Sequence, residues 1–203
     1  MSPRASVAAA RQTRAAILAH AVDLASVEGL AGLTIGRLAT DLGISKSGLL
    51  GHFGTKESLQ LAVVERAAEI FWHKVWTPVT DTPPGLPRLR AVCDAWVDYV
   101  ERAAFPGGCF FVATIGEVDD RPGPVRDAVR GCVVRWRREL SWQIELAVRA
   151  GELSPETDPQ EIIFALGASI MMLNHELRLH GDRTAVDRAR RAMSRALDRP
   201  PST

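Results

Sequence analysis

The stretch from Leu33 to Lys56, LTIGRLATDLGISKSGLLGHFGTK, constrains the fold more than any other part of this 203-residue chain. Thr34 can cap a first short helix, whose apolar residues recur at helical spacing. Gly43 suits the left-handed backbone of a sharp helix exit, and Ser45 can cap a second helix that ends near Phe53. Two short helices around so tight a turn predict a helix-turn-helix, whose second helix lies in the major groove of DNA.

The second helix is expected to turn Leu49 inward and to expose small and polar side chains. Hydroxyl, ammonium and imidazole groups suit phosphate oxygens, and a glycine lets the backbone approach a groove wall. The free N–H groups at the starts of three successive helices, near Thr34, Ser45 and Thr55, are further anion sites. Each of these residues alone is better explained as an ordinary helix cap. Together they favour nucleic-acid binding.

The same stretch resembles the TetR-type family of transcriptional regulators. The family pattern is matched by Thr34, Leu38-Ala39, Gly43-Ile44-Ser45, Ser47-Gly48-Leu49, His52-Phe53 and Thr55-Lys56-Glu57-Ser58-Leu59. The resemblance implies phosphate contacts for Thr34, Ser45, Lys46, His52 and Lys56, and groove contacts for Ser47 and Gly48. The chain departs from the family at Leu50 and Gly51, where aromatic residues are usual. Leu50 can make only apolar contact with DNA, for instance with a thymine methyl group.

The resemblance implies an all-α protein with an N-terminal three-helix DNA-binding domain, placed at residues 1–57, and a C-terminal effector-binding and dimerisation domain at 58–203. The implied function is that of a ligand-responsive repressor that binds a near-palindromic operator in double-stranded DNA as a homodimer. A small-molecule effector would release it. Two recognition helices would then lie roughly 34–36 Å apart, or a multiple of one DNA turn. No cofactor and no metal are expected.

Composition agrees with an intracellular globular protein. Hydrophobic residues make up 46% of the chain, and the net charge of +1 argues neither for nor against a nucleic-acid partner. Three cysteines without a C-x-x-C pair suit a reducing compartment. The sequence shows no run of about 18 apolar residues and no apolar leader at its start. A cytoplasmic location without membrane association is therefore expected.

Apolar periodicity predicts further helices near residues 11–27, 56–76, 89–104, 110–118, 125–150, 159–177 and 183–197, with a proline-rich loop at 77–87. The helix at 56–76 is apolar on more than one face, which predicts a connector between the two domains. The arginines of the last helix alternate with aspartates. This alternation favours a salt-bridged rim over a second DNA surface.

The last two predicted helices are the expected dimer interface, because each carries a stripe of apolar or small residues. The residues chosen are Ile163, Leu166, Ile170, Leu173, Leu177, Ala185, Ala189 and Met193. The alternative is that these stripes pack inside one protomer, and periodicity does not separate the two cases.

Large, soft side chains of the second domain are candidates for an effector pocket: Trp72, Trp96, Phe105, Cys109, Phe110, Trp136, Met171, Met172 and His175. Any one of them is more often plain core, whereas the family resemblance favours a cavity. Cys109 follows two glycines near the predicted start of a short helix. A redox- or electrophile-sensing regulator that acts through this thiol is therefore an alternative function.

An enzyme is not expected. His175 and His180 are five residues apart, whereas a zinc-binding pair on an α-helix needs a spacing of four. The sequence has no Gly-rich phosphate loop and no G-x-S-x-G motif. A helical dimeric adaptor that binds another protein is the remaining alternative class, but it leaves the pattern from Thr34 to Lys56 unexplained.

Overall fold

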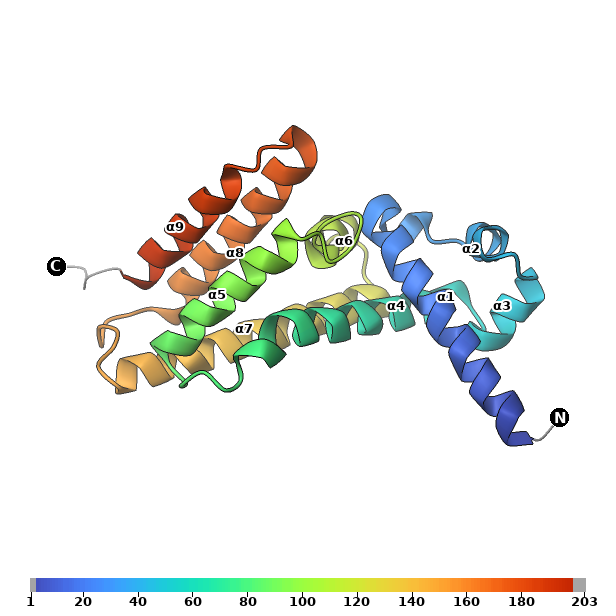
Figure 1. Cartoon of the computed structure of the whole chain (residues 1–203), viewed down its shortest axis with the longest axis horizontal. Helices are drawn as coiled ribbons and strands as arrows, with labels where there is room; N and C mark the ends of the chain where they lie inside the picture. The colour runs from blue at the N-terminus through green and yellow to red at the C-terminus, as the bar shows by residue number, and fades with distance from the viewer. Residues whose placement is uncertain (1–2, 199–203) are drawn as a thin grey trace. The chain divides into compact units, whose positions relative to one another are not determined.

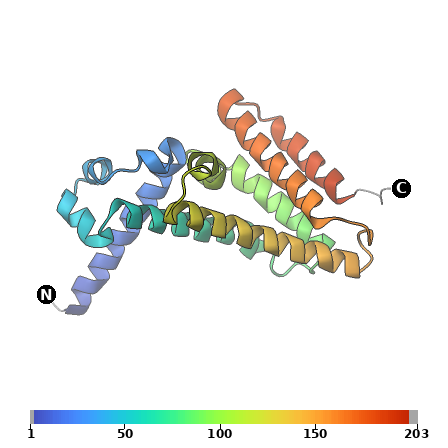
Figure 2. The same cartoon turned by 180° about the vertical axis from the view of Figure 1, so that it is seen from behind.

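The computed structural model describes residues 3–198, and of residues 3–7 only the backbone. Within this range the chain forms helices and no strands, so the predicted all-α class is confirmed (Figures 1 and 2). The α-helices are α1 (Pro3–Gly32), α2 (Ile35–Leu42), α3 (Lys46–Phe53), α4 (Lys56–Phe71), α5 (Leu86–Glu101), α6 (Phe110–Val118), α7 (Pro124–Arg149), α8 (Pro159–His175) and α9 (Ala185–Leu197). Three short helical segments complete the described chain: the π-helices η1 (Trp72–Trp76) and η3 (Glu176–His180), and the 3-10 helix η2 (Thr77–Val79).

Sequence periodicity located most of these helices and misplaced some of their ends. Helix α6 has the predicted bounds, whereas α1 begins at Pro3 rather than near residue 11. The extra turns, residues 3–10, contain four alanines, and alanine is the strongest helix former. The proline-rich loop is also shorter than predicted, because Thr77–Val79 is helical and Pro87 occupies the first turn of α5. Proline is tolerated there because the first-turn N–H groups have no partner inside the helix.

The chain divides into two compact units. The first contains the residues up to Ala68 together with Phe105–Val129, and the second contains Glu69–Ala104 and the residues from Arg130 onward. The unit that holds α2 and α3 therefore also holds α6. The domain boundary expected between residues 57 and 58 stays a prediction.

In the first unit, a break in α1 exposes backbone groups that other helices then bind. Gly29 leaves the helical conformation with φ 76° and ψ 169°. Beyond it, the Glu117 carboxylate accepts hydrogen bonds from the backbone N of Leu30 (2.7 Å) and of Ala31 (2.5 Å). On the other side of this turn, the Leu30 carbonyl accepts from Gln60 Nε2 at 2.7 Å and the Ala31 carbonyl accepts from Lys56 Nζ at 3.0 Å. Helices α4 and α6 thus both bind the last turn of α1, which we name the Leu30–Ala31 turn.

The segment before α6 approaches α1 very closely. The backbone N–H of Gly107 donates to Ser26 Oγ at 2.9 Å, and Ser26 Oγ donates to the Asp23 carbonyl at 2.7 Å. A Cβ atom on Gly107 would lie only 1.7 Å from the Ser26 carbonyl oxygen. No side chain fits there, so Gly107 sets the distance between α1 and the start of α6.

In the second unit, α8 packs against α9 and α5, and α9 also packs against α5 (Figures 1 and 2). Ion pairs join the outer surfaces of α5 and α9: Arg190 lies 2.6 Å from Asp94 and 2.5 Å from Asp98. Arg90 pairs in the same way with Asp198 at 2.5 Å. The salt-bridged rim expected for the last helix is confirmed, although exposed pairs of this kind contribute only about 0–1 kcal/mol each.

The residues predicted for the dimer interface lie mostly inside one protomer. All of them except Leu177, which is partly exposed, are buried: Ile163, Leu166, Ile170, Leu173, Ala185, Ala189 and Met193. Since α8, α9 and α5 cover one another, these stripes form their shared core. The alternative of packing inside the monomer is therefore what the structure shows for these seven side chains.

Two described helices are long and apolar enough to cross a membrane by length and composition alone: Ala8–Gly32 and Pro159–His180. This finding rests on mean hydropathy, which tolerates polar residues within the window, so it does not contradict the expected absence of an uninterrupted run of about 18 apolar residues. Of these windows 44% and 33%, respectively, are buried inside the fold. Core helices of soluble proteins pass the same test, so the finding does not assign the chain to a membrane.

We expect Gly107→Ala to lower the free energy of unfolding by roughly 1–3 kcal/mol, because the new Cβ overlaps the Ser26 carbonyl and forces α1 and the start of α6 apart. The matched control is Gly131→Ala, since a Cβ on Gly131 in α7 meets no atom within 4 Å. That variant should be neutral or up to about 1 kcal/mol more stable, because alanine favours helix over glycine. Urea unfolding at equal protein concentrations measures both, and equal midpoints for the two variants would contradict the close approach.

Candidate functional site

Helices α2 and α3 form the helix-turn-helix that their sequence predicts. Thr34 Oγ1 accepts a hydrogen bond from the Arg37 backbone N at 3.1 Å, and Ser45 Oγ accepts one from the Gly48 backbone N at 3.0 Å. Between these two caps, Gly43 adopts the left-handed conformation with φ 64° and ψ 29°. The predicted capping residues and the predicted turn glycine are confirmed.

One face of α3 is buried and the other is exposed. Leu49 is fully buried and Phe53 is 8% exposed, while Lys46, Ser47, Gly48, Leu50 and Gly51 lie on the surface. The Arg14 guanidinium of α1 lies 5.0 Å from the centre of the Phe53 ring. Two apolar side chains therefore fix α3 to the unit, and the face with the candidate DNA contacts is open to solvent. His52 is only partly exposed.

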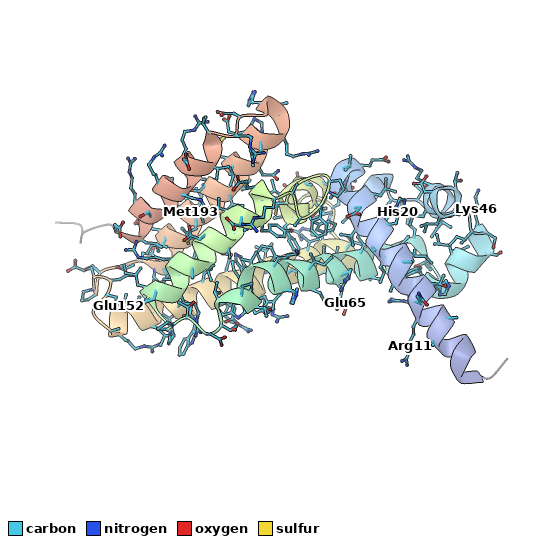
Figure 3. All side chains as sticks on the ribbon, in the orientation of Figure 1. Arg11, His20, Lys46, Glu65, Glu152 and Met193 are labelled. Atoms are coloured by element: carbon cyan, nitrogen blue, oxygen red, sulfur yellow. The ribbon has the colours of Figure 1, made fainter. Side chains whose placement is uncertain are left out.

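The two lysines predicted to contact phosphates differ in their surroundings. Lys46 makes no hydrogen bond or ion pair with any residue that the structure describes, and its side chain passes close to Gly36 of α2, where a Cβ atom would lie 3.5 Å from Lys46 Cε. Figure 3 labels Lys46 at the start of α3. Lys56, in contrast, donates to the Ala31 carbonyl at 3.0 Å. Lys46 is thus available to an anion, whereas Lys56 already has a structural partner.

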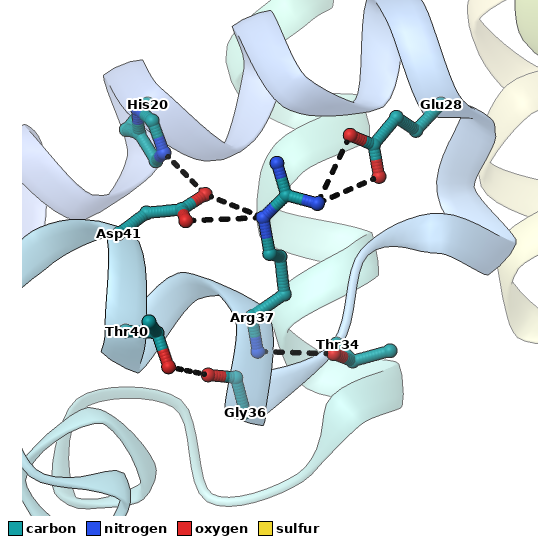
Figure 4. Close-up of polar contacts among 7 residues, drawn as sticks. All are labelled: His20, Glu28, Thr34, Gly36, Arg37, Thr40 and Asp41. Carbon is teal, nitrogen blue, oxygen red and sulfur yellow. Dashed lines mark hydrogen bonds and ion pairs between the residues drawn. The ribbon is translucent and has the colours of Figure 1, made fainter.

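A polar network fixes α2 on α1 (Figure 4). The Arg37 Nε lies 3.0 and 2.9 Å from the two carboxylate oxygens of Asp41, and Arg37 Nη1 lies 3.2 Å from Glu28. His20 Nε2 lies 3.2 Å from Asp41 Oδ2. The hydrogen bonds from His20 and Arg37 lower the pKa of the Asp41 carboxyl below its ordinary value. Arg37 is held by two carboxylates and therefore orients α2 within the protein.

The second unit contains a cluster of six aromatic side chains, which we name the aromatic cluster: Phe71, Trp72, Trp76, Trp96, Tyr99 and Trp136. Trp136 lies at its centre, with its ring 4.9 Å from Phe71, 5.2 Å from Trp96, 6.1 Å from Trp76 and 6.2 Å from Trp72. The structure thus brings together three residues proposed for the effector pocket, Trp72, Trp96 and Trp136.

The other pocket candidates lie elsewhere. Phe105, Cys109 and Phe110 are buried in the first unit, where the rings of Phe105 and Phe110 are 6.2 Å apart. Met171 and Met172 are 58% and 56% exposed on α8, and His175 is exposed on the same helix. Exposed methionines do not line a pocket within this protomer. Periodicity missed this because α8 is apolar on more than one side.

The thiols of Cys93 and Cys109 are both buried, whereas Cys132 is partly exposed. Cys109 is 2% exposed at the start of α6, and burial raises the pKa of the Cys93 thiol to about 12. Since the thiolate is the reactive form, burial of this kind disfavours reaction with oxidants and electrophiles. The sensor alternative for Cys109 stays a hypothesis that its burial does not favour.

His175, the last residue of α8, and His180, the last residue of η3, lie closer than their spacing suggested. Their ring centres are 5.5 Å apart, because the chain from Glu176 to His180 is π-helical and brings residues five apart onto one side. His175 and His180 therefore lie on the same side of the helix, contrary to the expectation for residues five apart on a regular α-helix. Within the described chain, however, no group of three or more His, Cys, Asp or Glu residues is placed to hold a metal ion.

Sequence reasoning missed an apolar surface on α8. Phe164 is 74% exposed, and Ala168, Met171, Met172 and His175 are exposed at helical spacing after it. We name these five residues the α8 stripe. Exposed apolar stripes of this kind are uncommon on monomers and typical of interaction surfaces.

Two family models of known proteins match this chain. Residues 17–63 match the family model described as bacterial regulatory proteins, tetR family, and residues 85–193 match the tetracyclin repressor-like C-terminal domain. Among solved structures, a TetR transcriptional regulator from Chloroflexus aurantiacus is similar, with 26% identity, a TM-score of 0.84 and coverage of 92% of this chain and 94% of that one. No curated protein sequence matches the chain.

Two further structures show the same fold with ligands. AibR in complex with isovaleryl coenzyme A and operator DNA is 21% identical, with a TM-score of 0.73 and coverage of 90% of this chain and 96% of that one. FadR from Bacillus subtilis in complex with stearoyl-CoA is 11% identical, with a TM-score of 0.69 and coverage of 89% and 96%. At these identities the likeness concerns the fold.

The network around Asp41 predicts a pH-dependent contribution to stability. Because the folded-state pKa of Asp41 lies below its unfolded value of about 3.9, the stabilisation is fully present above that value and is lost as the pH falls through the folded-state pKa. We expect Asp41→Asn to lower the free energy of unfolding at pH 7, and the difference from wild type to shrink towards pH 3.

Urea unfolding of both proteins between pH 7 and pH 3 measures this difference. Asp81→Asn is the matched control, since Asp81 is exposed and takes no part in the hydrogen bonds and ion pairs of the network. A difference between wild type and Asp41→Asn that stays constant across this range would contradict the role of the carboxylate.

Proposed function

The chain belongs to the TetR family of bacterial regulatory proteins, and we propose that it is a ligand-responsive repressor that binds a near-palindromic operator as a homodimer. The observation that carries this proposal is the exposed face of α3, held by Leu49 and Phe53 behind two capped helix starts. A helix presented in this way fits the major groove, with its first residues at the base edges.

Within this proposal, DNA contacts fall on residues at the start of α2 and along the exposed face of α3. The hydroxyls of Thr34 and Ser45 lie beside free helix N–H groups, which attract phosphate oxygens. Lys46 adds a positive charge, and Ser47 and Gly48 face the groove, with Leu50 beside them. His52 is partly exposed and stays a candidate phosphate contact. Lys56 is assigned a structural role at the Leu30–Ala31 turn instead, because its ammonium already donates to a carbonyl.

The α8 stripe is the proposed dimer surface in place of the buried residues chosen from periodicity. A two-fold interface brings the same patch of both protomers together, so Phe164, Met171 and Met172 of one copy would meet their equivalents. Each large apolar side chain contributes about 1.5–3 kcal/mol when it is fully buried. The exposed charged side chains of α9, including Asp187, Arg188 and Arg191, would form the polar rim.

The effector is proposed to bind in the second unit, where the aromatic cluster supplies a large apolar surface. Proteins of the same fold bind isovaleryl coenzyme A or stearoyl-CoA, which supports a small-molecule effector for this chain without specifying its chemical class. Effector binding would weaken DNA binding by the same free energy with which DNA disfavours the effector. As a repressor of bacterial genes, the protein is placed in the cytoplasm.

The DNA-binding proposal is tested with electrophoretic retardation of a near-palindromic fragment from the protein's own promoter region, compared with a scrambled fragment. Lys46→Ala should weaken binding to every sequence. It should also lower the slope of log affinity against log salt by about 0.9 for each lost phosphate contact, twice per dimer. Lys74→Ala, an exposed lysine of η1 in the second unit, is the matched control and should leave the slope unchanged. Equal retardation of both fragments by wild type would refute an operator-binding regulator.

The dimer proposal predicts that Phe164→Glu yields a monomer, because two buried carboxylates without partners would face each other across the two-fold axis. Light scattering coupled to size-exclusion chromatography should then report the mass of one chain instead of two. Val27→Glu introduces the same charge at an apolar residue of α1 that is 58% exposed, and it should remain dimeric. A dimeric Phe164→Glu variant would exclude the α8 stripe as the interface.

A further inference from the structure

Two buried indole N–H groups in the aromatic cluster have no acceptor among the described residues. The indole Nε1 atoms of Trp96 and Trp136 are enclosed, and neither has a hydrogen-bond partner among the residues that the structure describes. Trp96 is 9% exposed and Trp136 is 8% exposed. Their rings are 5.2 Å apart and nearly perpendicular, at 85°. Both unpartnered donors therefore belong to one pair of touching side chains.

Such a pair requires an explanation, because roughly 90% or more of buried polar groups in proteins are hydrogen-bonded. An indole N–H that has lost its water without gaining an acceptor destabilises the fold. The two donors thus point to an acceptor that joins the protein from outside the chain.

The backbone next to this pair has an unusual conformation. Trp72 and Trp76, which both contact Trp136, lie on the π-helix η1 directly after α4. π-helical turns occur mostly as single insertions in α-helices and are frequent at functional sites. Trp72 is only partly buried, and the Arg135 guanidinium lies 4.3 Å from its ring centre. The aromatic cluster therefore reaches from the buried indoles to the protein surface.

The charge of the buried interior limits what the acceptor can be. In the described part of the chain, the buried polar residues apart from the aromatic and cysteine side chains are Ser26, Thr114, Gln143 and Asn174, none of which is ionisable. A carboxylate or phosphate beside the two indoles would have no buried cation as its partner, because the Arg135 side chain at Trp72 is exposed. Burial of an unpaired charge is strongly unfavourable. A neutral carbonyl oxygen accepts hydrogen bonds from indole N–H groups without this cost.

We infer that the effector is a neutral, largely apolar molecule with a carbonyl-type oxygen that accepts hydrogen bonds from Trp96 Nε1 and Trp136 Nε1. Ketones, esters, amides and thioesters share this chemistry. The inference rests on the proposed function, because it names the chemical class of the effector at the site proposed above. It adds that recognition of the effector depends on its oxygen atom, which accepts hydrogen bonds from the two indole N–H groups.

Probes of similar size and shape test whether binding depends on a neutral oxygen acceptor. Acetophenone, isopropylbenzene and benzoate differ in whether they carry a neutral acceptor, no acceptor or a carboxylate, and 2-acetylnaphthalene, 2-isopropylnaphthalene and 2-naphthoate form a larger set. Binding to the full chain is followed by calorimetry and by NMR of ¹⁵N-labelled indoles, of which the chain has five. At least one ketone should bind about tenfold more tightly than its hydrocarbon, and the indole protons of Trp96 and Trp136 should move downfield.

Variants distinguish the contribution of the indole N–H donor to binding from that of the aromatic ring. Trp96→Phe and Trp136→Phe remove the N–H and keep an aromatic ring, and they also assign the indole signals. In these variants the ketone should bind no more tightly than its hydrocarbon, a comparison within one variant that is independent of the volume lost with the indole ring. Trp142→Phe is the matched control, because Trp142 lies on α7 outside the aromatic cluster and is 49% exposed. It should keep the full preference for the ketone.

The inference is overturned if the hydrocarbon binds as tightly as its ketone, if a carboxylate binds most tightly, or if a bound ketone leaves both indole signals in place. Failure of both ketones to bind up to their solubility limits overturns it as well. Operator retardation by the ligand-free wild type is measured in parallel. If the ligand-free protein retards the operator fragment and any of these results is obtained, only the proposed effector chemistry is wrong. If the ligand-free protein does not retard the operator fragment, the proposed function is wrong.

Discussion

The arrangement of the first unit depends on the hydrogen bonds that the Glu117 carboxylate accepts at the Leu30–Ala31 turn. Gly29 interrupts α1, and the interruption leaves backbone N–H groups that need an acceptor. A carboxylate forms strong hydrogen bonds there, since charge-assisted bonds are shorter and stronger than neutral ones. The carbonyls of the same turn are occupied by Lys56 and Gln60 from α4. One turn therefore joins α1, α4 and α6, and α2 and α3 follow directly from it along the chain.

This junction gives α6 an unusual position for a segment that follows α5 in sequence. It belongs to the same compact unit as α2 and α3, and the contact of Gly107 with Ser26 leaves no space for adjustment between α1 and the start of α6. Helix α4 begins with Lys56 at this junction and continues into η1, which carries Trp72 and Trp76 of the aromatic cluster. A single run of helical backbone thus carries both a contact of the Leu30–Ala31 turn and part of the aromatic cluster.

Helix α8 shows why a pattern of apolar residues is ambiguous. Its residues Ile163, Leu166, Ile170 and Leu173 are buried with α9 and α5, yet Phe164, Met171 and Met172 are exposed on another side. Both sets recur at helical spacing, so periodicity detects two faces without ranking them. Only the packing of α5 and α9 shows which face is buried within one protomer and which stays exposed. The same limit applies to the pocket candidates, of which Trp72, Trp96 and Trp136 gather, whereas Phe105, Cys109 and Phe110 lie in the other unit.

The helix-turn-helix was predictable from the amino acids because its signals are local. Thr34 and Ser45 bond to N–H groups three residues away, and Gly43 determines the turn through its own backbone, so neighbouring residues suffice to specify α2 and α3. The Glu117 contact joins residues 87 and 86 positions apart, and the unpartnered indoles come from two helices that are distant in sequence. The π-helical turn that brings His175 and His180 together also departs from the spacing assumed for a regular helix. These features arise from how helices pack, and packing depends on all the side chains at once rather than on any short pattern.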